Sequence, residues 1–160
     1  MNKMSKIDKS SFKLLQKNKK AFFNYTIIES IECGISLVGT EVKSLRMGMF
    51  SFADSYITVD EHNLTLVGLT IQPYTFGNMN NHTPARNRKL LAHKAEIKHL
   101  RRKVDERGFT LVPTEIYLRG NLVKVQVSLC KGKQEHDKRE EMKERDINRD
   151  TRRELKQLQY

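Results

Sequence analysis

The residues whose side chains could carry out catalysis or hold a metal are few and scattered along the chain. The five histidines form neither an HExxH nor an HxH pattern with a third ligand, so no metal site is predicted. The carboxylates of Glu32, Glu41 and Asp54 fall near the ends of predicted strands, but no pattern brings two of them together with a base, as nuclease chemistry requires. A serine nucleophile motif and a glycine-rich phosphate loop are also missing. We therefore expect neither an enzyme nor a bound cofactor.

Lysine and arginine are the charged side chains that this sequence concentrates in patches. The formal net charge is +11, with +6 in residues 1–20, +7 in residues 85–103 and −4 in residues 21–84. Basic patches of this kind favour a polyanion as partner, with nucleic acid ahead of anionic lipid.

The two cysteines and the apolar residues indicate the compartment. Cys33 and Cys130 form no CxxC pair and are predicted to be reduced, buried thiols. No apolar segment follows the lysine-rich start, and no run approaches 18 apolar residues. We expect a soluble, cytoplasmic protein without a membrane partner.

The apolar pattern predicts a flexible basic arm over residues 1–17, a body over 18–130 and a charged tail over 131–160. Within the body it predicts six short strands, over residues 21–30, 31–40, 52–60, 63–71, 109–119 and 121–130. The first two are expected to form a tight antiparallel pair, and Arg119-Gly120-Asn121 predicts a hairpin between the last two. A closed or nearly closed antiparallel barrel would hide the edges of so many short strands.

Two helices are predicted to carry cations on the outside of this body. A short helix over residues 41–47 would point Lys43 and Arg46 outward. A second helical region over 84–107 has an apolar face, and its other faces would present Arg86, Arg88 and Lys89 among further basic residues. Lys19 and Lys20 precede the first strand, and Tyr25 could stack on a base or lie in the core. Structured RNA, recognised by backbone and shape, fits this surface better than single-stranded RNA or DNA.

The tail, residues 131–160, has ten basic and eight acidic residues and few apolar ones. It cannot bury enough apolar surface to offset an ordering entropy of about 1–2 kcal/mol per residue. It is rich in helix formers and has pairs such as Glu141 and Arg145 at i,i+4. It is therefore either a helix that a partner orders, disordered when free, or a solvated charged tail without a role.

Several stretches together resemble one family, the bacterial SsrA-binding protein (small protein B), which is the partner of tmRNA in trans-translation. The stretches are NKKAFFNYTI at 18–27, GTEVKSLR at 39–46, DSY at 54–56, PARNRKLL at 84–91 and KGKQEHDKRE at 131–140, followed by KERD. The resemblance implies a barrel of the oligonucleotide-binding type with short helices and a tail that is unstructured in solution. It also implies binding to the tRNA-like domain of tmRNA, entry into the ribosomal A site beside ribosomal RNA, and a tail that becomes helical in the empty mRNA channel.

At matching positions, the resemblance assigns Asn18, Glu32 and Leu91 to the side of the barrel that contacts tmRNA. Glu32 could accept hydrogen bonds from base edges or 2′-hydroxyls, or orient a neighbouring arginine, and Leu91 would be exposed while Leu90 enters the core. The motif implied to act at the decoding centre comprises Gly132, His136, Asp137, Lys138 and Arg139, with the nearby basic residues Lys131, Lys133, Lys143 and Arg145.

The chain departs from the family pattern at two places. The family commonly has histidine and an acidic residue before the tyrosine of the first strand, where this chain has Phe23-Asn24. Phe23 could stack on ribosomal RNA but could not make the polar contact. The distal tail also contains Asp146, Asp150 and Glu154, which weaken its attraction to RNA. The alternative function is that of a structural ribosomal protein or another binder of ribosomal RNA.

Overall fold

The computed structural model describes residues 12–77, 79, 81–106 and 108–158. Seven strands form the main sheet, in the order β1-β8-β4-β5-β7-β2-β9, and all their pairings are antiparallel. Their bounds are β1 (Phe12–Lys17), β2 (Tyr25–Ile35), β4 (Tyr56–Val59), β5 (Leu64–Val67), β7 (Arg88–Leu91), β8 (Phe109–Arg119) and β9 (Leu122–Gly132). Two short strands, β3 (Phe50–Ser51) and β6 (Thr70–Ile71), pair separately. The helices are α1 (Lys19–Asn24), α2 (Gly39–Arg46), α3 (Lys94–Val104) and α4 (Glu135–Gln157).

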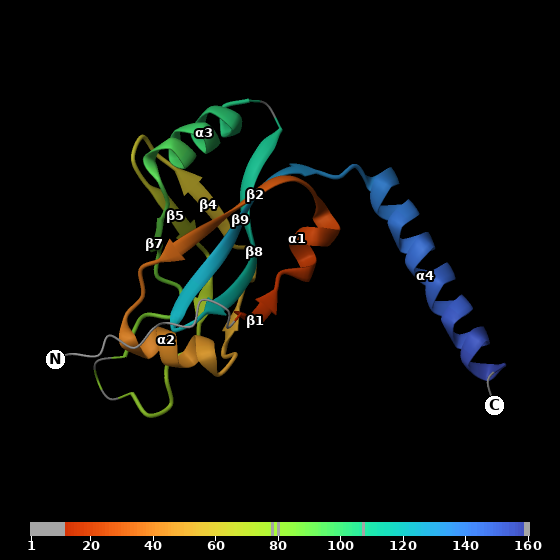
Figure 1. Ribbon diagram of the computed structural model, residues 1–160, viewed down its shortest axis with the longest axis horizontal. Helices are drawn as coiled ribbons and strands as arrows, with labels where there is room; N and C mark the ends of the chain where they lie inside the picture. The colour runs from red at the N-terminus through yellow and green to blue at the C-terminus, as the bar shows by residue number, and fades with distance from the viewer. Residues whose placement is uncertain (1–11, 78, 80, 107, 159–160) are drawn as a thin grey trace.

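Six of the seven strands close into a ring, because β9 pairs with β8 as well as with β2. The seventh, β1, pairs with β8 along residues 115–119. Helices α2 and α3 lie at opposite ends of this ring (Figure 1). The predicted antiparallel barrel with short helices is confirmed.

The ring encloses one main apolar core. Val123, Val125, Val127 and Leu129 are buried, as the alternation in the sequence predicts, and each fully buried side chain of this kind contributes about 1.5–3 kcal/mol. The hairpin predicted between β8 and β9 is confirmed. Arg119 pairs with Leu122, and Gly120 adopts a φ of +63° that favours glycine. Cys33 and Cys130 are free and buried, and burial raises the pKa of their thiols to about 12 and about 11.

The first strand of the body differs from the prediction. Residues 19–24 form α1 because the Asn18 side chain accepts a hydrogen bond from the backbone N–H of Ala21 at 3.2 Å and so caps the helix. A single strand, β2, then replaces the two predicted over 21–30 and 31–40. Gly34 lies inside this strand. A Cβ atom at this position would meet the Cβ of Leu91 on β7 at 3.2 Å.

The helical region predicted over 84–107 is also partly wrong. Arg88–Leu91 form β7, which pairs with β5 and β2, and α3 begins only at Lys94. Side chains along β7 alternate, because Arg88 and Leu90 are buried while Lys89 and Leu91 are exposed. This is the period of a strand with one face in the core.

The two ends of the chain correspond to the predicted basic arm and charged tail. The last part of the predicted arm, residues 12–17, belongs to the sheet as β1, and residues 1–11 lie outside the described residues. At the other end, α4 extends away from the ring and has no buried residue (Figure 1). Its helical state is the one that the sequence predicts for an ordered tail, and the coil predicted for the free protein stays a prediction. Among the described residues, no helix is long and apolar enough to cross a bilayer.

Candidate RNA-binding surface

Glu32 and Leu91, which the family resemblance assigns to one binding side, do lie together. Gly34 of β2 pairs with Leu91 of β7, and Glu32 is two residues before Gly34 on the outer face of β2. Both residues line a surface hollow of about 420 Å³, together with Gly34, Ala92, His93, Glu96 and Lys124. Leu91 is 54% exposed, whereas Leu90 is buried in the core, as expected. The hollow thus combines an apolar platform, two carboxylates, a histidine and a lysine. The platform suits a ribose or base, the carboxylates suit hydrogen-bond donors, and the lysine suits a phosphate.

The carboxylate of Glu32 is held by two residues that the sequence reasoning missed. The hydroxyl of Tyr117 donates a hydrogen bond to Oε2 at 2.5 Å, and a guanidinium nitrogen of Arg119 lies 3.1 Å from the same oxygen. Burial, followed by the bond to Glu32, raises the pKa of Tyr117 above its ordinary value. Arg119 meets the expectation that Glu32 could orient a neighbouring arginine. The register of the predicted hairpin, which pairs Tyr117 with Lys124, was the available signal.

A second basic surface follows the start of α1. Lys17, Lys19 and Lys20 line a hollow of about 540 Å³ beside Ser51, Phe52, Ala53 and Asp54. Lys20 lies 2.5 Å from Asp54 and Lys17 lies 3.8 Å from Glu115. Lys19 is therefore the lysine of this hollow with no ion pair among the described residues, and surface ion pairs such as the other two neutralise charge only weakly. Tyr25 is half-buried and packs against the small cluster of Ala21, Val112 and Cys130. This packing supports the core reading of Tyr25, and stacking on a base stays a prediction.

Asn18 differs from the sequence expectation of a direct RNA contact. It is only 6% exposed, and besides capping α1 its amide donates a hydrogen bond to the backbone oxygen of Pro113 at 2.9 Å. The amide oxygen and one N–H of the amide are thus bonded within the protein, and Asn18 also lines the hollow of Lys19 and Lys20. Asn18 acts by fixing where α1, and with it Lys19 and Lys20, leaves the sheet.

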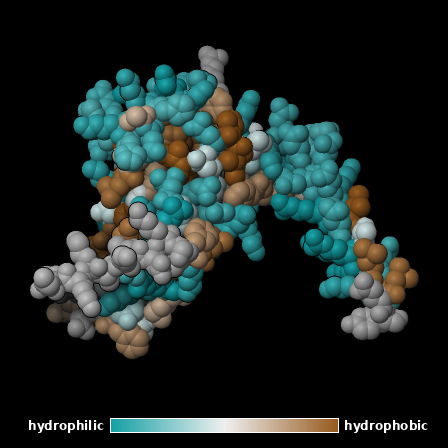
Figure 2. Space-filling model, viewed as in Figure 1, coloured by the Kyte–Doolittle hydropathy of each residue, from teal (hydrophilic) through white to brown (hydrophobic). Residues whose placement is uncertain are grey.

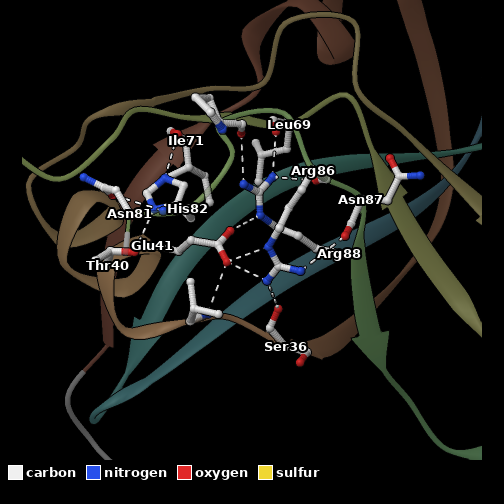
Figure 3. Close-up of polar contacts among 12 residues, drawn as sticks. Ser36, Thr40, Glu41, Leu69, Ile71, Asn81, His82, Arg86, Asn87 and Arg88 are labelled. Atoms are coloured by element: carbon white, nitrogen blue, oxygen red, sulfur yellow. Dashed lines mark hydrogen bonds and ion pairs between the residues drawn. The ribbon is translucent and has the colours of Figure 1, made fainter. Parts of the chain in front are cut away.

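Arg88 is the second correction to the predicted site. Its side chain is fully buried and its guanidinium forms an ion pair with the buried carboxylate of Glu41 on α2 (Figure 3). Arg88 also donates hydrogen bonds to three backbone oxygens, those of Leu69 at 2.7 Å, Pro84 at 2.9 Å and Arg86 at 3.1 Å. An arginine satisfied in this way cannot reach RNA, because it lies on the inward face of β7 and not on a helix surface.

Arg86 shares the carboxylate of Glu41 but remains partly exposed. Its Nε and a terminal nitrogen lie 2.9 and 2.5 Å from Oε1 of Glu41, and 35% of its side chain is accessible. Burial alone would raise the pKa of Glu41, but hydrogen bonds from Arg86, Arg88 and the backbone N–H of Val38 together lower it. The network therefore contains two guanidinium groups and one ionised carboxylate. Its net positive charge is accessible at the surface through Arg86, the partly exposed member.

The other predicted basic residues of the body are exposed. Lys89 points outward from β7, Arg46 from α2, and the ammonium group of Lys43 lies 5.3 Å from the centre of the Tyr74 ring. This cation–π contact orients Lys43 without neutralising it.

The first part of the tail is attached to α1. Lys131 and Gly132 end β9, and the ammonium group of Lys133 donates hydrogen bonds to the backbone oxygen of Phe22, at 3.2 Å, and to Glu141. The guanidinium of Arg145 lies 3.0 Å from Glu141 and 5.9 Å from the centre of the Phe23 ring. These contacts join the first turns of α4 to the body.

The remaining tail residues of the predicted motif lie on the accessible part of α4. His136, Asp137, Arg139 and Lys143 are exposed and Lys138 is half-buried. Among the described residues, one trio could approach a metal ion, His136, Asp137 and Glu140, whose ligand atoms lie within 4.8 Å of one another. Because all three are exposed, and exposed acidic groups are common without an ion, we assign no metal site. Hydrophilic side chains cover most of α4 and the region over α3 (Figure 2).

A closed antiparallel ring with cationic and mixed hollows on its outside defines a nucleic-acid-binding protein of the small-barrel class. The chain belongs to the SmpB protein family, whose model matches residues 15–157.

Similar proteins match over nearly their whole length. The chain is 49% identical over 150 residues to the SsrA-binding protein of Treponema denticola, covering 94% of this chain and 97% of the relative. It is 45% identical over 152 residues to the SsrA-binding protein of Oleidesulfovibrio alaskensis, covering 95% and 98%. A solved structure described as "tmRNA-SmpB: a journey to the center of the bacterial ribosome" is similar with a TM-score of 0.63 and 44% identity, over 75% of this chain and 85% of that chain.

Proposed function

We propose that this chain binds the tRNA-like domain of tmRNA and delivers tmRNA to stalled ribosomes for trans-translation. The observation that carries the proposal is the match to an SsrA-binding protein over 94% of this chain at 49% identity. The protein acts by binding, without catalysis, in the bacterial cytoplasm.

The body supplies the grip on RNA in this proposal. The hollow between β2, β7 and β9 provides Glu32 and Leu91, and exposed or partly exposed cations surround the ring. The RNA-binding residues we propose are Lys19, Lys20, Tyr25, Glu32, Lys43, Arg46, Arg86, Lys89 and Leu91. Cations on several faces suit a folded RNA better than one extended strand, because a folded RNA can present phosphates to more than one face of the protein.

The tail acts on the ribosome after the body has bound tmRNA. A helix of 23 residues, the length of α4, spans roughly 34 Å at 1.5 Å per residue. This length supports the proposal that the tail extends from the ring into the decoding centre and the empty mRNA channel. The residues proposed for this step are Lys131, Gly132, Lys133, His136, Asp137, Lys138, Arg139, Lys143 and Arg145.

The alternative, a structural ribosomal protein, rests on the same basic surface and predicts a different stoichiometry. A structural component sediments with ribosomes at one copy per particle whether or not tmRNA is present. We expect instead that the protein in cell lysates follows the amount of tmRNA and leaves the ribosome fraction when the tmRNA gene is deleted. Retention at one copy per ribosome in the deletion strain would favour the alternative.

A further inference from the structure

The carboxylate of Glu32 is bonded through one of its two oxygens. Oε2 receives the Tyr117 hydroxyl and lies beside Arg119, whereas no hydrogen bond or ion pair between described residues uses Oε1. The Glu32 side chain is 31% exposed and lines the hollow that also holds Leu91 and Lys124. The carboxylate is thus bonded through one oxygen, and its side chain lines the hollow.

An ionised carboxylate can only accept hydrogen bonds, and phosphates are acceptors as well. Glu32 therefore cannot bind an RNA phosphate and must meet an N–H or O–H donor. In RNA such a donor is a base amino or imino group or a ribose 2′-hydroxyl. Arg119, which lies 3.1 Å from Glu32, and Lys124 in the same hollow would reduce the repulsion between this carboxylate and the phosphates of a bound RNA.

The position and packing of Tyr117 fix its hydrogen bond to this carboxylate. Its side chain reaches Glu32 across the outer face of β9, which separates β8 from β2 in the ring. The residue is only 5% exposed, and its ring lies against Phe12 with 4.9 Å between ring centres. A buried, packed ring holds its hydroxyl at a fixed place, so the hydrogen bond restricts the rotamers of Glu32.

We propose that Tyr117 is a positioning residue for RNA recognition, which holds Oε2 of Glu32 so that Oε1 faces a hydrogen-bond donor of the bound RNA. The inference rests on the proposed function, because it needs RNA in the hollow beside Glu32. It adds a residue that lies outside the motifs of the sequence, and it gives the hollow a specificity for donors over phosphate.

The test is a double-mutant cycle on the full-length chain, with the tRNA-like domain of tmRNA as the probe. Tyr117→Phe removes the hydroxyl and keeps the packed ring. We expect it to weaken binding by about tenfold in the natural background and to have almost no effect in a Glu32→Ala background, since the two residues act as a unit. The salt dependence of binding should stay unchanged, because no phosphate contact is lost. Equal losses in both backgrounds would overturn the proposal.

A control on the same strand separates positioning from general destabilisation. Thr114 is fully buried and its hydroxyl contacts the Ser128 hydroxyl, at 2.8 Å, and the Gln126 backbone. Thr114→Val should lower the melting temperature at least as much as Tyr117→Phe but leave RNA affinity intact. If Thr114→Val weakens RNA binding as much as Tyr117→Phe does, the effect of Tyr117 is structural and the proposal fails.

The same RNA distinguishes the two possible donors. Inosine in place of guanosine removes the guanine amino group, and 2′-deoxy nucleotides remove the ribose hydroxyl. The RNA substitution that lowers the affinity for the natural chain should not lower the affinity for the Glu32→Ala variant. A loss of affinity that persists with the Glu32→Ala variant contradicts the proposal. If the natural chain itself shows no preference for the tRNA-like domain over a generic duplex, the proposed function fails, and not the role of Tyr117 alone.

Discussion

The guanidinium of Arg88 and the carboxylate of Glu41 form an ion pair in which both side chains are fully buried. The two residues lie 47 positions apart along the chain, and their contact joins α2 to β7. Because Arg86 also bonds to Glu41 and is partly exposed, one buried carboxylate both stabilises the ring and positions a surface cation. The GTEVKSLR and PARNRKLL stretches thus meet at a structural contact.

Removing the charge of Glu41 should destabilise the protein strongly. Glu41→Gln leaves Arg88 buried without its counter-ion, and loss of one partner of a buried pair costs about 3–5 kcal/mol. Chemical denaturation should therefore show a fall of this size in the free energy of unfolding. Glu61→Gln is the control, because the Glu61 side chain is 70% exposed and its ion pairs contribute little. A change of less than about 1 kcal/mol for Glu41→Gln would contradict the structural role.

The same carboxylate makes stability depend on pH in a defined direction. The pKa of Glu41 in the folded protein lies below its ordinary value of 4.5, since the hydrogen bonds from the arginines outweigh burial. Its contribution is therefore fully present above the unfolded pKa and is lost as pH falls through the folded pKa. The difference in unfolding free energy between the natural chain and Glu41→Gln should be constant above about pH 5.5 and shrink below about pH 4.5. A difference that grows on acidification would contradict the assignment.

Neighbouring residues on β7 should behave in opposite ways. Lys89 is exposed and Arg88 is buried, so Lys89→Ala should reduce the slope of log K against log salt by about 0.7–0.9 without lowering stability. Arg88→Met, of similar length, should change stability and leave the salt slope of the folded fraction unchanged. Titrations of tmRNA at several salt concentrations measure both slopes. A reduced slope in Arg88→Met with a normal one in Lys89→Ala would mean that the two faces are assigned the wrong way round.

The β8–β9 hairpin and the barrel could be predicted from the sequence because strict alternation and a glycine turn are local signals. β7 could not, because the long basic and leucine side chains of RNRKLL also suit a helix. The burial of Arg88 depends on Glu41, which only the closed ring brings close. Likewise Asn18 looks like a surface residue until Pro113, 95 residues away, accepts its amide.

The candidate site likewise depends on contacts between residues that are distant in the sequence. The family resemblance was enough to place Glu32 and Leu91 on one side of the barrel. Tyr117 and Arg119 lie outside the motifs, and only their positions in β8, across β9 from Glu32, reveal their contact with it. Pairings across a sheet depend on register, which distant residues and turns determine together.

Truncation of the chain after Lys133 should separate RNA binding from ribosome function. No residue of α4 is buried, so the ring should remain folded and the affinity for tmRNA should stay within a few-fold of the natural value. Tagging of peptides on stalled ribosomes should be abolished, because the helix that enters the mRNA channel is gone. A full-length chain with residues 142–157 in scrambled order controls for charge. Equal loss of binding and tagging on truncation would reject this division of labour.

The most direct test of the account is a titration of the full-length protein against tmRNA, ordinary tRNA and a generic RNA duplex at two salt concentrations. We predict tighter binding to tmRNA at both, with affinities that fall as salt rises because lysines and arginines displace counterions from phosphates. Equal affinity for tmRNA, tRNA and a generic duplex would contradict a body that recognises one folded RNA.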